Sequence, residues 1–132
     1  FADYIKHFHC DNPRVNILGG GEIRMEDYLV MITDFSSIVF DFVYLERPVL
    51  YFVPDYTLFK AGVTHNYREL DIPIEDGFGE FTQTAAELIE SLRRLAENKF
   101  QPAPQYAEKM KGFFLDRGKS HSDKLYEALM KE

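Results

Sequence analysis

The sequence predicts a Rossmann-like α/β fold, a three-layer domain in which helices cover both faces of a parallel sheet. Two uninterrupted apolar runs, at residues 29–32 and 49–53, are typical of strands that are buried on both faces. Between them, residues 36–45 carry apolar side chains on nearly every side of a helix. A strand, a helix and a second strand joined by short turns form a βαβ unit, and such units build parallel sheets.

The segment before this unit is predicted to contain a helix end, a short strand and a short helix. Residues 3–8 resemble the end of a helix, which Asn12-Pro13 terminates before a strand at residues 15–18. Glycines 19–21 lack the spacing and the lysine of phosphate-binding loops, so we interpret them as a connector. Residues 22–28 are predicted to be helical and to lead into the first apolar strand.

The segment after the unit is predicted to be a loop followed by three helices. Residues 56–81 show no periodicity and indicate a long loop with a short helix. Leucine and isoleucine at helical spacing predict a helix over residues 85–98, capped by Thr82 or Thr84. A helix over residues 105–115 and a last helix from residue 119 or 120 complete one domain, residues 1–132, of ordinary size.

Hydroxyl and carboxylate side chains follow the first apolar strand, in Thr33, Asp34, Ser36 and Ser37. Asp34 or Ser36 is expected to cap the next helix, and free N–H groups beside two serine hydroxyls would favour a phosphate. Helix capping without any ligand is an equally good interpretation of the spacing alone. Because ligands lie outside the carboxyl ends of parallel strands, residues 54–56 are expected to face the same crevice.

Two elements of the sequence resemble a known enzyme family. Thr33-Asp34-Phe35-Ser36-Ser37, with Phe40-Asp41-Phe42 and Arg47-Pro48-Val49 behind it, resembles the signature of the CDP-glycerol glycerophosphotransferases. Members of that family build poly(glycerol phosphate) teichoic acid chains and related polymers. Further along, Asp116-Arg117-Gly118-Lys119-Ser120-His121-Ser122 is similar to a late element of the same family, in the expected order.

The sequence departs from the family pattern at two positions near the first element. Phe35 stands where tyrosine is more usual, and Leu29 stands where an aspartate commonly precedes the strand. Both departures leave the hydroxyl-rich turn intact.

The resemblance implies that the chain is the C-terminal half of a two-domain GT-B type transferase. A sequence that begins Phe1-Ala2-Asp3 without methionine fits such a fragment. The residues expected to hold the diphosphate of CDP-glycerol are Thr33, Asp34, Ser36, Ser37, Gly118, Lys119 and Ser120. The terminal polymer hydroxyl would attack the β-phosphorus and CMP would leave, and the base would come largely from residues outside this chain. No catalytic residue and no cofactor are assigned to this half, which is expected to be inactive alone.

Two rival functions stay open at this level. One is a GT-B glycosyltransferase that uses another nucleotide-activated sugar, and the other is a non-catalytic α/β interaction module.

The net charge of −7 argues against a nucleic-acid partner, because no basic stripe is present to displace counterions. A single cysteine and the lack of an apolar run of about 18 residues favour a cytoplasmic protein. The parent could still be peripheral on the cytoplasmic membrane face.

Other candidate residues receive structural interpretations. His7, His9, Cys10 and Asp11 offer one thiol and no second ligand pair, so no metal site is expected there. His65 and His121 lie on irregular segments and are interpreted as solvated side chains. Most of the 12 phenylalanines and 8 tyrosines are expected in the core. The candidates for stacking on a cytosine ring are Tyr56, Phe59 and Tyr67.

Overall fold

The computed structural model describes residues 7–18, 23–66, 69–114 and 120–130. Its centre is a parallel sheet of three strands, β1 (Met31–Thr33), β2 (Val49–Phe52) and β3 (Gly79–Thr82), in the order β1-β2-β3. Met31 pairs with Val49, and Val49 pairs with Gly79 on its other side. The predicted α/β class and the parallel sheet are therefore confirmed.

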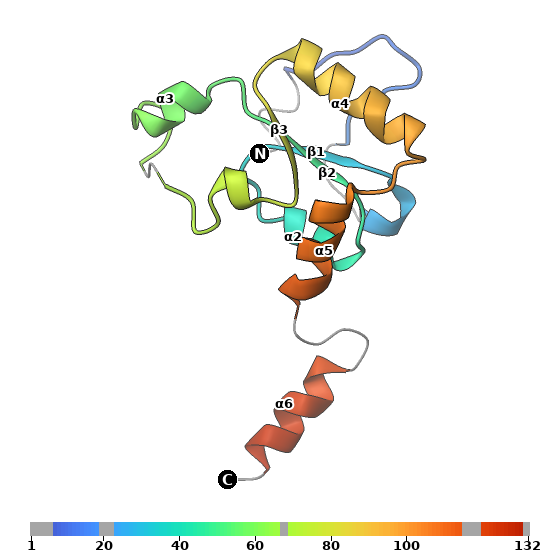
Figure 1. Cartoon of the computed structure of the whole chain (residues 1–132), viewed down its shortest axis with the longest axis vertical. Helices are drawn as coiled ribbons and strands as arrows, with labels where there is room; N and C mark the ends of the chain where they lie inside the picture. The colour runs from blue at the N-terminus through green and yellow to red at the C-terminus, as the bar shows by residue number, and fades with distance from the viewer. Residues whose placement is uncertain (1–6, 19–22, 67–68, 115–119, 131–132) are drawn as a thin grey trace.

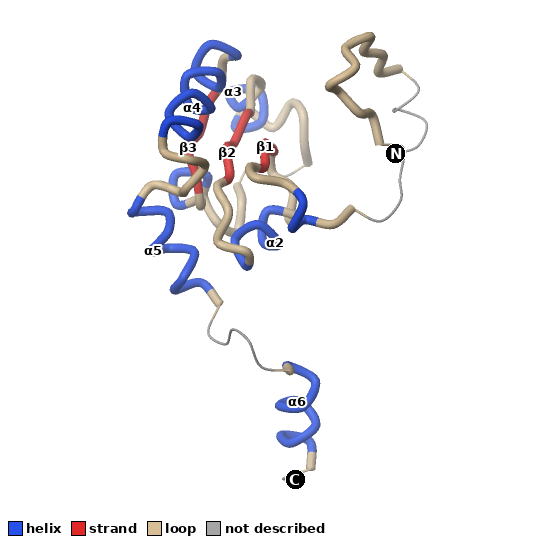
Figure 2. Tube along the Cα trace, turned by 90° about the vertical axis from the view of Figure 1, so that its right-hand side faces the viewer, coloured by secondary structure: helices blue, strands red, loops and turns tan. Residues whose placement is uncertain are grey.

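Helices cover the two faces of this sheet (Figures 1 and 2). The helical elements are η1 (Met25–Asp27), α2 (Val39–Tyr44), α3 (Tyr56–Lys60), η2 (Ile74–Asp76), α4 (Ala85–Glu97), α5 (Pro104–Phe113) and α6 (His121–Leu129). Helices α2 and α5 lie on one face and α4 on the other, whereas α6 lies apart from the sheet in both views. Within the described ranges, no helix is long and apolar enough to cross a membrane.

Strand β2 supplies the centre of the core, and its alternate side chains serve different layers. Val49 and Tyr51 pack in one cluster with Phe42 and Val43 of α2 and with Met110 of α5. Leu50 points to the opposite face and is 1% exposed. Apolar residues at successive positions of this strand are therefore buried on both sides, which explains the uninterrupted apolar run in the sequence.

A polar network joins α4 to the edge strand β3. Ser91 is buried, and its hydroxyl donates to Glu80 Oε2 at 2.5 Å. Arg94 Nη2 donates to the same oxygen at 2.5 Å. Burial alone would raise the pKa of Glu80, but the hydrogen bonds from Ser91 and Arg94 and the charge of Arg94 outweigh it and hold the pKa below its usual value.

We expect the Glu80→Gln variant to be less stable than the parent chain at pH 7, by about 1 kcal/mol after solvent screening. Because folding lowers the pKa of Glu80, its contribution is present above the unfolded pKa of about 4.3 and is lost as the pH falls through the folded pKa. Urea unfolding at pH 7 and pH 3 measures the difference. The control Glu97→Gln removes an exposed ion pair between Glu97 and Arg93 within α4. It should lower the free energy of unfolding by less than about 0.5 kcal/mol. Equal losses in the two variants at pH 7 would contradict the prediction.

The helix-start prediction for α4 is confirmed, and that for α2 is wrong. Thr84 accepts a hydrogen bond from Glu87 N, and the Glu87 carboxylate accepts one from Thr84 N in return. At α2 the N-cap position is Ile38, in helical conformation, and no side-chain hydrogen bond caps it. Ser36 takes part through its backbone oxygen, which accepts from Val39 N at 3.2 Å. Residues 36–38 thus form a turn, and the helix starts later than predicted.

Three further predictions need correction. Residues 15–18 form no strand, because Val15 N closes a turn onto Asn12 O and the apolar side chains there are largely exposed. The helix predicted over residues 22–28 is reduced to η1. Residues 56–81 contain α3, η2 and most of β3, a strand that the sequence pattern did not indicate. The helix predicted at residues 3–8 falls mostly outside the described residues, as do glycines 19–21.

Candidate functional site

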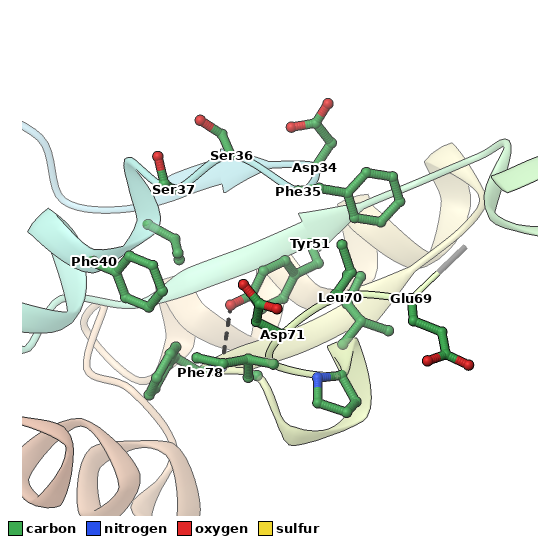
Figure 3. A pocket seen from close by; sticks show the side chains of 15 residues that line it. Asp34, Phe35, Ser36, Ser37, Phe40, Tyr51, Glu69, Leu70, Asp71 and Phe78 are labelled. Carbon is green, nitrogen blue, oxygen red and sulfur yellow. Dashed lines mark hydrogen bonds between the residues drawn. The ribbon is translucent and has the colours of Figure 1, made fainter. Parts of the chain in front are cut away.

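A cavity of about 460 Å³ lies beside β2, between the turn that follows β1 and the segment that precedes β3 (Figure 3). This volume is within the usual range for small-ligand sites. Its lining residues are Asp34, Phe35, Ser36, Ser37, Val39, Phe40, Tyr51, Glu69, Leu70, Asp71, Ile72, Pro73, Ile74, Gly77 and Phe78. We call residues 34–37 the β1 turn and residues 69–78 the strap. The cavity therefore has two walls that are far apart in the sequence.

An aromatic cluster holds the β1 turn in place. The Phe35 ring lies over the Phe59 ring of α3, with centroids 4.4 Å apart. The His65 ring meets both Phe35 and Phe59 edge-on, at 5.7 Å and 5.5 Å. His65 is half-buried in this cluster, so its interpretation as a solvated side chain is wrong. Its role in the structure is packing behind the turn.

Tyr51 connects the strap to the sheet. Its ring is buried, and its hydroxyl oxygen accepts a hydrogen bond from Phe78 N at 3.3 Å (Figure 3). Burial raises the pKa of Tyr51, the hydrogen bond from Phe78 N partly opposes this, and the charge of Tyr106 adds to the rise. The phenol therefore stays protonated near neutral pH and can donate its own proton to a ligand or a water molecule.

The interior of the cavity is aromatic and aliphatic, and the charged groups among its described lining residues are acidic. Phe40 N donates to Ser37 O of the β1 turn, and the Phe40 ring forms an edge-on pair with the ring of Phe78 on the strap, their centroids 6.3 Å apart (Figure 3). The carboxylates belong to Asp34, Glu69 and Asp71, and the described lining residues include no lysine, arginine or histidine. A phosphate would be repelled near Asp71, so the interior suits an uncharged, ring-shaped group with hydroxyl or amino donors.

Three of the predicted site residues line the cavity, at its edge. Figure 3 shows the Asp34 carboxylate and the Ser36 and Ser37 hydroxyls on the β1 turn, pointing away from Tyr51 and Asp71. Thr33 ends β1 but does not line the cavity. The β1 turn thus presents its side-chain oxygens to solvent at the edge of the cavity.

The described part of the second predicted element does not line this cavity. Gly118 and Lys119 lie outside the described residues. Ser120 caps α6, where its hydroxyl accepts from Asp123 N at 3.3 Å, and α6 lies away from the cavity in both views. The structure therefore does not show two helix starts converging on one phosphate, and binding by these residues stays a prediction.

The strand end after β2 faces a different cavity from the one predicted. Pro54 and Asp55 do not line the main cavity, and Tyr56 lines a neighbouring one of about 250 Å³. Phe59 is 1% exposed and lies beneath Phe35, so it cannot stack on a base. Tyr67 lies outside the described residues.

Several lining residues were not predicted from the sequence, among them Tyr51, Leu70, Asp71 and Phe78. An alternation of apolar and polar residues could have indicated that the strap leads into a strand. Strand β3 spans only Gly79–Thr82, which is too short to show such an alternation.

Metal-ligating groups do not gather in the described part of the chain, where no three histidine, cysteine or acidic side chains are suitably grouped. His9 Nε2 lies 2.8 Å from Asp11 Oδ1, and both side chains are exposed.

Comparison with known proteins identifies the relatives of this chain. Minor teichoic acid biosynthesis protein GgaB of Bacillus subtilis (strain 168) is 26% identical over 129 residues, which are 98% of this chain and 13% of that protein. Teichoic acid poly(glycerol phosphate) polymerase of the same strain is 28% identical over 103 residues, 77% of this chain and 13% of that protein. The polymerase of the same name from Bacillus spizizenii is 30% identical over 70 residues, 53% of this chain and 17% of that protein.

The chain thus spans less than a fifth of the length of these curated relatives. No solved structure gives a significant match. The model of the family described as CDP-Glycerol:Poly(glycerophosphate) glycerophosphotransferase matches residues 26–131, a range that contains the β1 turn, the strap and α6. The resemblance seen in the sequence is therefore confirmed, and the chain belongs to the CDP-glycerol:poly(glycerophosphate) glycerophosphotransferase family.

Proposed function

We propose that this chain is the donor-binding part of a transferase that moves glycerol phosphate from CDP-glycerol to a terminal hydroxyl of a growing polymer. The observation that carries the proposal is the cavity itself. Its mouth is formed by Asp34, Ser36 and Ser37, and its interior is lined by aromatic rings. Membership of the family supports the choice of donor.

The proposed orientation follows from the charges of the lining residues. The cytosine and ribose lie in the interior, where the half-buried ring of Phe40 lines the cavity and Asp71 accepts hydrogen bonds from hydroxyl or amino groups. The diphosphate projects past the β1 turn, away from Asp71, and receives hydrogen bonds from the hydroxyls of Ser36 and Ser37. Helix α2 has six residues and begins beyond this turn, so we assign the phosphate contacts to the serines and not to a helix dipole.

The proposed reaction needs groups beyond this chain. The polymer hydroxyl oxygen forms a bond to the β-phosphorus, the bond from that phosphorus to the bridging oxygen breaks, and CMP leaves. A base in the remainder of the parent protein takes the hydroxyl proton. Phosphoryl transfer depends mainly on positioning and on charge stabilisation, so a donor-binding part alone would be inactive. We propose that the parent has a second, N-terminal half, as in GT-B transferases, and acts in the cytoplasm or at the cytoplasmic membrane face.

A nucleotide titration of the 132-residue chain followed by NMR tests the proposal. CDP-glycerol and CMP are expected to shift the amides of the β1 turn and of the strap, whereas cytidine should shift the strap alone. The double variant Ser36→Ala/Ser37→Ala should weaken CDP-glycerol about tenfold, because it removes hydrogen bonds to a charged group, and should leave cytidine unchanged. Thr57→Ala, at an exposed hydroxyl residue of α3 that does not line the cavity, is the control and should change neither.

The rival functions predict different results in the same titration. Tighter binding of UDP-sugars than of CDP-glycerol would favour a glycosyltransferase with another donor. If no nucleotide shifts these amides at millimolar concentration, the chain is not a donor site by itself. The result would then favour a non-catalytic interaction module.

A further inference from the structure

A third cavity, of about 480 Å³, lies at the opposite edge of the sheet, where β1 and β2 begin. Its lining residues are Leu29, Leu45, Glu46, Arg47, Pro48, Lys99, Phe100, Gln101, Pro102, Ala107 and Lys111. They come from the starts of two strands, from the ends of α2 and α4 and from α5. The proposed donor site and this cavity share no lining residue.

Three cations, Arg47, Lys99 and Lys111, surround this cavity in a chain of net charge −7. The other lining charge is the carboxylate of Glu46. Elsewhere in the described structure, arginines 24, 93 and 94 pair with carboxylates. By contrast, none of the three cavity cations forms an ion pair with any carboxylate among the described residues.

The donors of these cations are largely unused. Arg47 Nη1 donates to Tyr28 O, and the other N–H groups of the guanidinium remain available to a ligand. In the described part of the chain, neither lysine side chain donates a hydrogen bond. Two helices end here, and a helix C-terminus attracts cations, but the backbone N–H groups of Arg47 and Phe100 already bond the terminal carbonyls of Phe42 and Leu95. The lysines are therefore not needed to satisfy those carbonyls.

The backbone beside this cavity is left-handed at three lining residues that are not glycine. Lys99 and Phe100 both have left-handed φ values, 53° and 55°, at the end of α4. Glu46 has a φ of 53° at the equivalent position after α2. Glycine is the usual residue at such a position, because a side chain there costs stability. Non-glycine residues in this conformation are a reason to look for a function.

We propose that Arg47, Lys99 and Lys111 form a binding site for a phosphate ester, distinct from the donor cavity. An arginine fork with two lysines matches the several acceptor oxygens of a phosphate. The uncharged lining residues, Leu29 and Phe100 among them, leave room for the organic part of the ester. This proposal makes no assumption about the donor, and its test follows residues that do not line the donor cavity.

The test is an NMR titration of the 132-residue chain with sn-glycerol 3-phosphate and, separately, inorganic phosphate. Amides of residues 47, 99 and 111 are expected to shift, with binding weakened by added salt. Lys99→Gly and Lys111→Gln should each weaken binding about three- to tenfold. Glu46→Gly is the matched control for Lys99→Gly, because both relieve the same backbone strain. Since it removes a negative charge, it should leave binding equal or tighter.

A binding experiment with lipid vesicles distinguishes the sources of the phosphate. If the chain binds phosphatidylglycerol vesicles but not phosphatidylcholine vesicles, and Lys99→Gly abolishes that binding, the ligand is a lipid headgroup. A preference for glycerol 3-phosphate assigns the site to a soluble ester. Inorganic phosphate binding as tightly as either assigns it to the free ion. The proposal is overturned if no probe shifts these amides, or if Lys99→Gly and Lys111→Gln bind as the parent chain does. Either result leaves the CDP-glycerol titration at the β1 turn unaffected, so the two proposals fail separately.

Discussion

Replacing Gly79 with alanine is expected to lower the free energy of unfolding by at least about 3 kcal/mol, enough to unfold much of a small domain. Gly79 begins β3 and pairs with Val49 of β2. A Cβ atom at this position would lie 1.8 Å from Val49 O and 2.6 Å from Val49 C. Because the obstructing atoms are backbone, no side-chain rotation relieves the clash, and the two strands must separate.

The matched control for this substitution is Gly112→Ala. Gly112 lies in α5, and a Cβ atom there would meet nothing within 4 Å. Alanine is a better helix former than glycine, so this variant should gain about 0.5–1 kcal/mol. Urea unfolding followed by circular dichroism measures both variants. A Gly79→Ala chain as stable as the parent would show that the β2–β3 pairing is not as described.

Truncating Phe59 to alanine should cost about 3–5 kcal/mol, the range for large aromatic side chains in a core. Phe59 is 1% exposed and contacts the rings of Phe35, Tyr56 and His65. Its loss leaves a cavity beneath Phe35, so the β1 turn loses its support as well. Thermal unfolding measures the stability loss, and the milder Phe59→Leu variant, which should remain folded, is used to measure nucleotide binding.

Leu58→Ala is the control for Phe59→Ala, because it removes a neighbouring apolar side chain of the same helix that is 48% exposed. Its effect on stability should remain below about 1 kcal/mol. If Phe59→Leu folds but binds CDP-glycerol as tightly as the parent chain, then the aromatic cluster does not position the β1 turn.

The parts of the fold that sequence predicts well are those with a local signal. The apolar runs of β1 and β2 and a threonine cap at Thr82 or Thr84 depend on neighbouring residues, and the structure contains both strands and the cap, at Thr84. Strand β3 was missed because its four residues include Gly79, a poor strand former, and Glu80, whose carboxylate accepts hydrogen bonds from Ser91 and Arg94 of the distant helix α4. Residues 15–18 were wrongly predicted as a strand, because an apolar run of this length does not reveal whether a partner strand is present.

The candidate site divides in the same way. Asp34, Ser36 and Ser37 were found from the turn chemistry and the family resemblance, and they line the cavity. The strap could not be assigned, because its place against the sheet depends on the hydrogen bond between Phe78 N and Tyr51, 27 residues apart in the chain. Long-range contacts of this kind leave no periodicity in the sequence.

The separation of the β1 turn from the strap has a consequence for how donor choice can diverge among related enzymes. The two walls are carried by different segments, and the hydrogen bond between Phe78 and Tyr51 ties the strap to β2 without touching the β1 turn. In the proposed orientation of the donor, substitutions in residues 69–74 can therefore reshape the end of the cavity next to the base without changing Ser36 and Ser37, the proposed phosphate contacts. One scaffold could in this way evolve new nucleotide preferences without rebuilding its anion contacts.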